Sequence, residues 1–222
     1  IHDVPLQALH VVFAIDRAGL VGEDGETHHG VFDPAFLDTV PGMTVLCPSS
    51  YAELESMLRY AIYEVKGPVA VRYPRGGQGD YQEDSGLVST AVLRAGKDIT
   101  LTGYGITVNA LLDCARRLEA DGIQAQVLKL NTITPLDGAP VAASAAETGR
   151  LLVAEEAAPG NCVGQRLAAK LLERGVAAKV AMVNTGPGFV THGPVSQLRT
   201  LCGLDGASLY KTALEVCGHG NC

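Results

Sequence analysis

The segment from Asp16 to Gly30 contains the side chains best suited to chemistry. Its sequence, DRAGLVGEDGETHHG, follows a short apolar run at residues 11–15 that predicts a β-strand. The segment combines a guanidinium, carboxylates, a hydroxyl and two imidazoles with several glycines, which let backbone turn tightly and approach a ligand closely. Ligands of open α/β sheets bind beyond the carboxyl ends of strands. The segment therefore indicates a ligand-binding loop, with a solvated surface loop as the alternative.

Two arginines are candidates for binding an anion. Arg17 follows the apolar run at 11–15, and Arg75 follows a second apolar run at 69–73. If the two strands are neighbouring and parallel, their carboxyl ends lie at one edge of the sheet. The two guanidinium groups could then converge on one phosphate, which a guanidinium binds through two hydrogen bonds. The alternative is two separate surface arginines.

Histidine and cysteine patterns were considered for proton transfer and for metal binding. The imidazole of His28 suits proton transfer at neutral pH, although a loop histidine can equally be a solvated residue. The adjacent His29 does not form a same-face metal pair with it. Near the C-terminus, Cys217, His219 and Cys222 offer three ligands where a structural zinc site has four, so we favour a frayed terminus there. The sequence thus predicts no metal site.

The apolar periodicity predicts an α/β fold with two domains and mainly parallel sheets. The strands at 88–94 and 98–103 are too close for a helical crossover, so we expect them to form an antiparallel hairpin or one bent edge. The glycine-rich segment 76–86 predicts a flexible linker that proteases cut first, which divides the chain into domains 1–82 and 83–222. Further strands are predicted at 11–15, 44–47, 69–73, 124–130, 150–154 and 178–183, and helices at 33–40, 50–65, 106–120, 138–147, 161–174, 195–202 and 206–217.

Composition excludes several classes of protein. A net charge of −7 over 222 residues disfavours a nucleic-acid surface, and no apolar run is long enough to span a membrane. The six cysteines include no CxxC pair, which favours reduced thiols and a cytoplasmic location. Because the first residue is Ile rather than Met, we expect a fragment, a processed chain or one subunit.

Several motifs, in order, carry a family resemblance. They are HDV at 2–4, DRAGLVGEDGETH at 16–28, RYPRG at 72–76, PLD at 135–137, VAEE at 153–156, HG at 192–193 and GLD at 203–205. Together they resemble the later part of 1-deoxy-D-xylulose-5-phosphate synthases, which are thiamine-diphosphate enzymes of the transketolase group. The resemblance implies a partial transketolase-like pyrimidine-binding domain followed by a transketolase-type carboxyl-terminal domain.

The resemblance also implies roles for four residues. Arg17 and Arg75 would hold the phosphate of glyceraldehyde 3-phosphate, His28 would lie at the reaction centre, and Asp24 would lie in the same pocket. The complete enzyme condenses pyruvate with this acceptor, uses thiamine diphosphate and magnesium, and is expected to be a homodimer. Most ligands of the cofactor and the metal would lie upstream of Ile1, so we assign none in this chain, and we expect the chain alone to be inactive.

The sequence leaves three other functions open. A transketolase or the beta subunit of a 2-oxo acid dehydrogenase would use the same cofactor with other substrates. A non-catalytic assembly subunit would use the same fold only to dock to a partner. The DRAGLVG and RYPRG runs favour the synthase over these alternatives.

Overall fold

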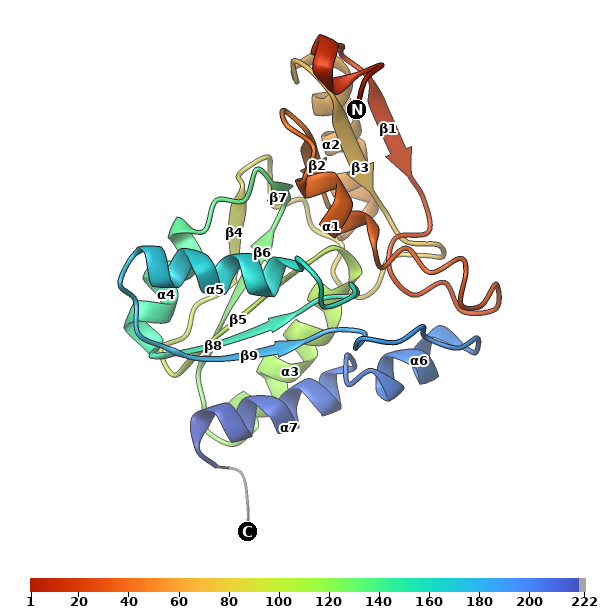
Figure 1. Ribbon diagram of the computed structural model, residues 1–222. Coiled ribbons are helices and arrows are strands. Elements are labelled where there is room, and N and C mark those ends of the chain that lie inside the picture. The colour runs from red at the N-terminus through yellow and green to blue at the C-terminus, as the bar shows by residue number, and fades with distance from the viewer. Residues whose placement is uncertain (220–222) are drawn as a thin grey trace.

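The structure, a computed structural model that describes residues 1–219, contains two sheets covered by helices (Figure 1). The first sheet has the order β1-β3-β2-β7 and the second has the order β4-β6-β5-β8-β9. The strands are β1 (Val12–Ile15), β2 (Thr44–Leu46), β3 (Val69–Arg72), β4 (Thr90–Arg94), β5 (Ile99–Tyr104), β6 (Ala125–Leu130), β7 (Thr132–Thr134), β8 (Arg150–Ala154) and β9 (Lys179–Val183). Pairing is parallel except for β7 with β2 and β4 with β6. The predicted α/β class with mainly parallel sheets is confirmed.

Helices cover both faces of the second sheet, as Figure 1 shows. Alternate residues of β8 explain this arrangement: Leu151 and Val153 pack with α4 and α5, whereas Leu152 and Ala154 pack with α3 and α7. This alternation is what a strand buried on both faces requires. The α-helices are α1 (Asp33–Asp38), α2 (Tyr51–Tyr63), α3 (Val108–Ala120), α4 (Ala139–Thr148), α5 (Val163–Glu173), α6 (Val195–Leu201) and α7 (Gly206–Cys217), and short 3₁₀ turns occupy Pro5–Gln7 and Gly105–Thr107.

Helix α2 begins where the sequence places its cap. The hydroxyl of Ser50 accepts a hydrogen bond from the backbone N–H of Glu53 at 3.1 Å. The Glu53 carboxylate accepts in turn from the N–H of Ser49 at 2.7 Å, one residue earlier than in a standard capping box. These contacts turn the Glu53 side chain inward, so it is fully buried rather than solvated.

The hairpin predicted from 88–94 and 98–103 is wrong. Strand β4 pairs antiparallel with β6, while β5 lies between β6 and β8 with parallel partners on both sides. The connecting turn crosses the start of β6, because the N–H groups of Lys97 and Asp98 both donate to the Gln124 carbonyl at 3.0 Å. Gly96 permits this crossing, since a Cβ there would lie 2.2 Å from the carbonyl carbon of Ala125. The turn therefore carries the chain from β4, on one side of β6, to β5, on the other side.

The segment from Gly76 to Gly86 connects the two sheets but is not loosely held. Tyr81 is buried, and its N–H donates to the side-chain oxygen of Asn109 at 2.9 Å. Gly79 lies directly against Asn109, where a Cβ would approach to 2.4 Å. Strand β7, which follows this segment in the sequence, also belongs to the first sheet. The connection is therefore anchored at Gly79 and Tyr81, and both the protease-sensitive linker and the domain boundary after residue 82 stay predictions.

Candidate active site

The loop between β1 and α1 is closed at its neck by its own backbone. Gly19 and Gly30 exchange two hydrogen bonds, at 2.8 and 2.9 Å. Gly30 sits against the carbonyl of Arg17, where an added Cβ would lie 2.2 Å from the oxygen. Arg17 itself has a φ of 57°, a left-handed conformation that is unfavourable for a residue with a Cβ. Such strained residues cluster at functional sites.

Asp24 joins the two predicted phosphate ligands. Its Oδ2 lies 2.6 Å from Nη1 of Arg75 and 3.7 Å from Nε of Arg17. Arg17 also binds the carboxylate of Asp16 at 2.7 Å. Strands β1 and β3 are parallel neighbours, so both arginines emerge at the same sheet edge. The structure therefore brings the guanidinium groups of Arg17 and Arg75 together around one oxygen of the Asp24 carboxylate. A guanidinium pair of this kind suits an anionic ligand.

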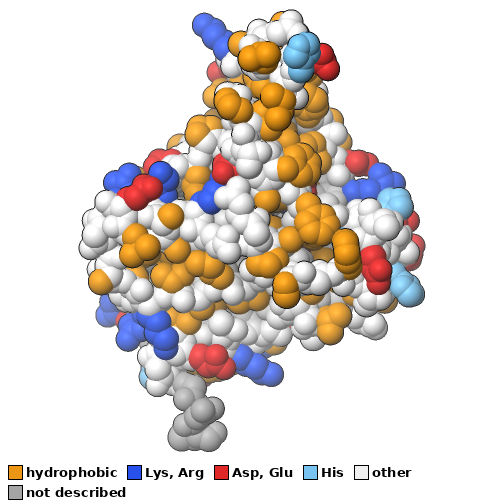
Figure 2. All heavy atoms as spheres, viewed as in Figure 1, with side chains coloured by type: hydrophobic (Ala, Val, Ile, Leu, Met, Phe, Trp, Pro, Cys, Tyr) orange, Lys and Arg blue, Asp and Glu red, His pale blue; other side chains and the backbone are white. Residues whose placement is uncertain are grey.

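His28 lies in the same loop but has a different neighbour. Its imidazole is exposed, and Nδ1 lies 3.0 Å from the hydroxyl of Thr27. Its hydrogen-bond partner is thus an adjacent residue rather than a member of the arginine–aspartate cluster. Figure 2 shows basic, acidic and histidine side chains gathered around the projecting loop between β1 and α1. The imidazole is free to meet a ligand bound at the loop surface.

His29 has a structural position that the sequence did not reveal. Its ring is buried, and Nδ1 accepts a hydrogen bond from the N–H of Val21 at 3.0 Å. Nε2 therefore carries the proton and donates to the carbonyl of Thr191 at 3.2 Å. Adjacent histidines thus have opposite environments: His28 faces solvent, and His29 fixes the shape of the loop.

Arg72 and Asp33 form a buried ion pair beneath the loop. Arg72 Nε donates to Asp33 Oδ2 at 2.6 Å, and the same guanidinium reaches the carbonyl of Gly30. Burial alone would lower the pKa of Arg72, but the Asp33 carboxylate and the Tyr104 ring, 5.7 Å from the guanidinium, raise it, so the arginine stays charged. Asp33 is the first residue of α1, directly after the N-cap residue Phe32, and its carboxylate is held by Arg72.

Two hollows lie near these residues, and they differ in chemistry. One, of about 230 Å³, is bordered by the loop at Val21–Glu23, by Arg75 and by the segment Gly193–Val195. The other, of about 250 Å³, lies between Pro48, Tyr51, Leu54, Tyr73 and Ile106, and its lining includes no charged side chain. Only the first suits a phosphorylated ligand, because a buried anion needs a charged or hydrogen-bonding partner. Of the four predicted site residues, Arg75 borders this hollow, whereas Arg17, Asp24 and His28 do not line it.

The described part of the chain gathers few groups that could bind a metal. Among residues 1–219, no group of three or more His, Cys, Asp or Glu side chains could hold an ion. The tail considered as three ligands includes Cys222, which lies outside the described residues. We therefore assign no magnesium ligand among the described residues. No helix within the described range has the length and apolar character needed to cross a bilayer.

Two family models match the chain, each over one of its parts. The transketolase pyrimidine binding domain matches residues 1–78, and the transketolase C-terminal domain matches residues 89–209. A solved structure described as "Split gene transketolase, inactive beta4 tetramer" has a TM-score of 0.76 and 26% identity, and the match covers 97% of this chain and 69% of that one. Fold and sequence together define a transketolase-type protein.

Closer relatives narrow the family. The 1-deoxy-D-xylulose-5-phosphate synthases of Chlorobium luteolum and Heliobacterium modesticaldum are each 40% identical to this chain over 220 residues. The synthase of Gloeobacter violaceus is 39% identical over 221 residues. Each match covers 97% of this chain but only 34–35% of the relative, so the chain spans about a third of their length. The chain therefore belongs to the transketolase family, and its sequence matches the later part of the 1-deoxy-D-xylulose-5-phosphate synthases.

Proposed function

We propose that this chain supplies the acceptor-binding part of a 1-deoxy-D-xylulose-5-phosphate synthase. Such an enzyme condenses pyruvate with glyceraldehyde 3-phosphate, releases carbon dioxide, and provides the precursor of isoprenoids, thiamine and pyridoxal. The observation that carries the proposal is the convergence of Arg17 and Arg75 on one carboxylate oxygen. This cluster lies in the loop whose sequence resembles the synthases.

Each residue of the cluster has a proposed role. Arg17 and Arg75 bind the acceptor phosphate through charge-assisted hydrogen bonds. Asp24, whose carboxylate lies between the two guanidinium groups, contacts the hydroxyls of the acceptor in the same pocket. His28, exposed at the loop surface, transfers protons to and from the reacting oxygen atoms.

The cofactor is assigned to the rest of the enzyme. Thiamine diphosphate with magnesium supplies the carbanion chemistry when bound, and its ligands are proposed to lie on the part of the relatives that this chain does not match. That part is the main partner, either on the same polypeptide or as a separate chain, and the whole is proposed to be a cytoplasmic homodimer. The five described cysteines are free thiols, which suits a reducing compartment.

Reconstitution tests this function against its rivals. The chain alone is expected to show no turnover and weak binding of thiamine diphosphate in calorimetric titration. Joined to, or mixed with, the remaining two thirds of a relative, it should convert pyruvate and glyceraldehyde 3-phosphate to 1-deoxy-D-xylulose 5-phosphate. Transfer from a ketose phosphate would favour a transketolase. If the partner reached full turnover without this chain, the chain would have only an assembly role.

Substitution of either arginine tests the phosphate contact. Arg17→Ala and Arg75→Ala should each lower kcat/KM for glyceraldehyde 3-phosphate about 10- to 150-fold, because each removes hydrogen bonds to a charged group. The KM for pyruvate should hardly change. Arg→Lys should recover part of the loss, since lysine keeps the charge but not the planar pair of donors. Arg59, an exposed residue on α2, provides the matched control as Arg59→Ala. Equal damage to both substrates would show that the arginines serve the fold instead.

A further inference from the structure

We propose that Glu156 is a positioning residue for the Asp16–Gly30 loop. The residues that precede the Gly76–Gly86 segment are called the first unit below, and those that follow it, which include Glu156, the second unit. Glu156 follows β8 and is distant from the loop in sequence. The residue is buried, with 3% of its surface exposed. The contact between Glu156 and the loop is present in the structure. Its consequence for catalysis rests on the proposed function of the loop.

The two oxygens of the Glu156 carboxylate have different partners. Oε2 accepts a hydrogen bond from the backbone N–H of Leu20 at 2.9 Å, and Oε1 accepts from Nε of Arg199 on α6 at 2.6 Å. The backbone carbonyl of the same residue accepts from Arg72 Nη2 at 3.4 Å. A buried carboxylate with an arginine on one oxygen is itself fixed, so it can fix the backbone amide on the other.

The neck of the loop is shaped around this carboxylate. A Cβ added to Gly19 would lie 2.1 Å from Oε2 of Glu156, so a side chain and the carboxylate cannot coexist there. Gly19 also has a φ of 78°, which disfavours any residue with a Cβ. The contact is therefore direct packing as well as hydrogen bonding, two residues after Arg17.

Other contacts from the second unit hold the far end of the same loop. His29 donates to the carbonyl of Thr191 at 3.2 Å, and the N–H of Ala158 donates to the carbonyl of Val31 at 2.8 Å. Figure 1 shows the loop lying beside α6 and the segment that precedes it. Asp24 and His28 lie between the points that are held. Glu156 is the charged member of this set, so its removal is expected to have the largest effect.

The adjacent residue provides a matched control. Glu155 is as buried as Glu156, but its carboxylate accepts from the hydroxyl of Tyr104 at 2.8 Å and from the N–H groups of Val163 and Gly164 at 3.0 and 2.8 Å. All of these partners belong to the second unit. Loss of Glu155 should therefore weaken that unit without releasing the loop, whereas loss of Glu156 should release the loop.

Amide hydrogen exchange on the 222-residue chain tests the contact without any need for activity. Glu156→Ala should speed exchange at Leu20 about 10- to 150-fold, the range expected for a lost hydrogen bond to a charged group. Exchange at Leu152 in β8 should follow the change in overall stability, which Glu155→Ala also produces. Glu156→Gln keeps an acceptor oxygen and should give a smaller increase in the exchange rate at Leu20. This variant provides the test if Glu156→Ala does not fold.

The outcomes separate this inference from the proposed function. Unchanged exchange at Leu20, or equal increases in the Glu155 and Glu156 variants, would overturn the positioning role whatever the kinetics. Selectively faster exchange at Leu20 supports it. In the complete enzyme, Glu156→Ala should then raise KM for glyceraldehyde 3-phosphate more than for pyruvate, and Glu156→Gln should recover part of that rise. Faster exchange with an unchanged KM would keep the positioning role and count against the phosphate role of the loop.

Discussion

Replacing His28 by alanine is expected to lower kcat of the complete enzyme about 10²- to 10⁴-fold, the usual contribution of a positioned acid–base group. The side chain is exposed and binds only its neighbour Thr27 among the hydrogen bonds of the described residues, so its loss should not unfold the chain. KM for pyruvate should change little. Steady-state kinetics with both substrates, together with thermal unfolding of the same preparations, measure the two effects separately.

Two other histidines provide controls for this result. His2→Ala removes an exposed histidine outside the Asp16–Gly30 loop and should leave kcat unaltered. His29→Ala should instead lower stability, because the ring is buried and holds both Val21 and Thr191. If kcat of His28→Ala matched that of His2→Ala, His28 would be an ordinary loop residue.

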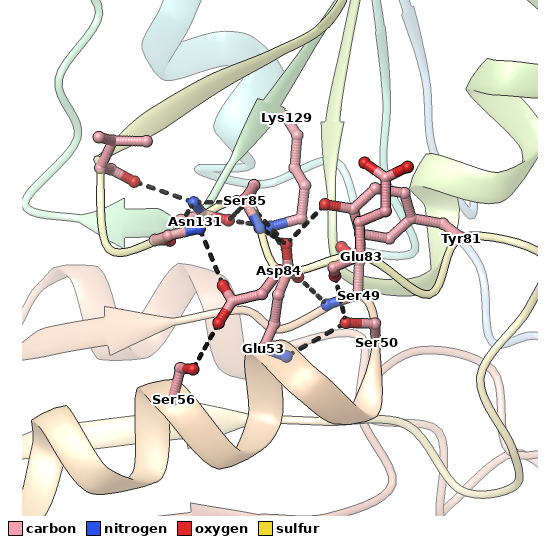
Figure 3. Close-up of polar contacts among 12 residues, drawn as sticks. Ser49, Ser50, Glu53, Ser56, Tyr81, Glu83, Asp84, Ser85, Lys129 and Asn131 are labelled. Atoms are coloured by element: carbon pink, nitrogen blue, oxygen red, sulfur yellow. Dashed lines mark hydrogen bonds and ion pairs between the residues drawn. The ribbon is translucent and has the colours of Figure 1, made fainter.

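Replacing Lys129 by methionine should destabilise the chain by about 3–5 kcal/mol, the usual cost of removing one partner of a buried ion pair. Lys129 on β6 lies 2.9 Å from the carboxylate of Glu53 on α2, and neither side chain is accessible to solvent. Figure 3 shows this pair at the centre of a polar network. Tyr81 and Ser85 of the connecting segment donate to the other carboxylate oxygen at 2.9 and 2.7 Å. Without Lys129, the Glu53 charge would be buried without its cation.

A double variant separates this pair from simple loss of packing. Lys129→Met combined with Glu53→Gln removes both charges and should recover much of the stability that the single variant loses, so the two effects should not add. Urea unfolding of the wild type, both single variants and the double variant gives the four values needed. Fully additive losses would show that the ion pair contributes nothing as a pair.

The same pair predicts a dependence of stability on pH. Burial alone would raise the pKa of Glu53, but Lys129, with hydrogen bonds from Ser85, Lys129 and Ser49, lowers it below its ordinary value of 4.5. A carboxyl with a lowered folded pKa contributes stability above its unfolded pKa, and this contribution is lost as pH falls through the folded value. The wild type should therefore lose more stability below pH 4.5 than the double variant does.

Local patterns predicted most of the elements but not their long-range partners. The apolar runs at 69–73 and 150–154 became β3 and β8, because an apolar run bounded by polar turns is what a buried strand requires. The position of β4 depends instead on long-range pairing. Strand β5 pairs with one edge of β6, so β4 pairs with the other edge. Lys129 in the apolar sequence VLKL was a visible sign of a buried charge, but its partner Glu53 is distant in sequence.

The candidate site shows the same division. The spacing of glycines and polar residues was enough to identify the loop, and the strand order then placed Arg17 and Arg75 at one edge of the sheet. Spacing could not reveal Glu156 or His29, because their function depends on contacts between the two units. A buried-looking strand that ends in two acids was the available signal for Glu156, and it pointed equally to Glu155.

We propose that this chain recognises the phosphate of an acceptor sugar through Arg17 and Arg75. The most direct test is the ratio of kcat/KM for glyceraldehyde 3-phosphate to kcat/KM for glyceraldehyde, measured in the complete enzyme and in its Arg17→Ala/Arg75→Ala variant. We expect a large ratio in the parent and a ratio near unity in the variant, with activity on glyceraldehyde preserved. A ratio that stays large in the variant, while activity on both acceptors falls together, would contradict it.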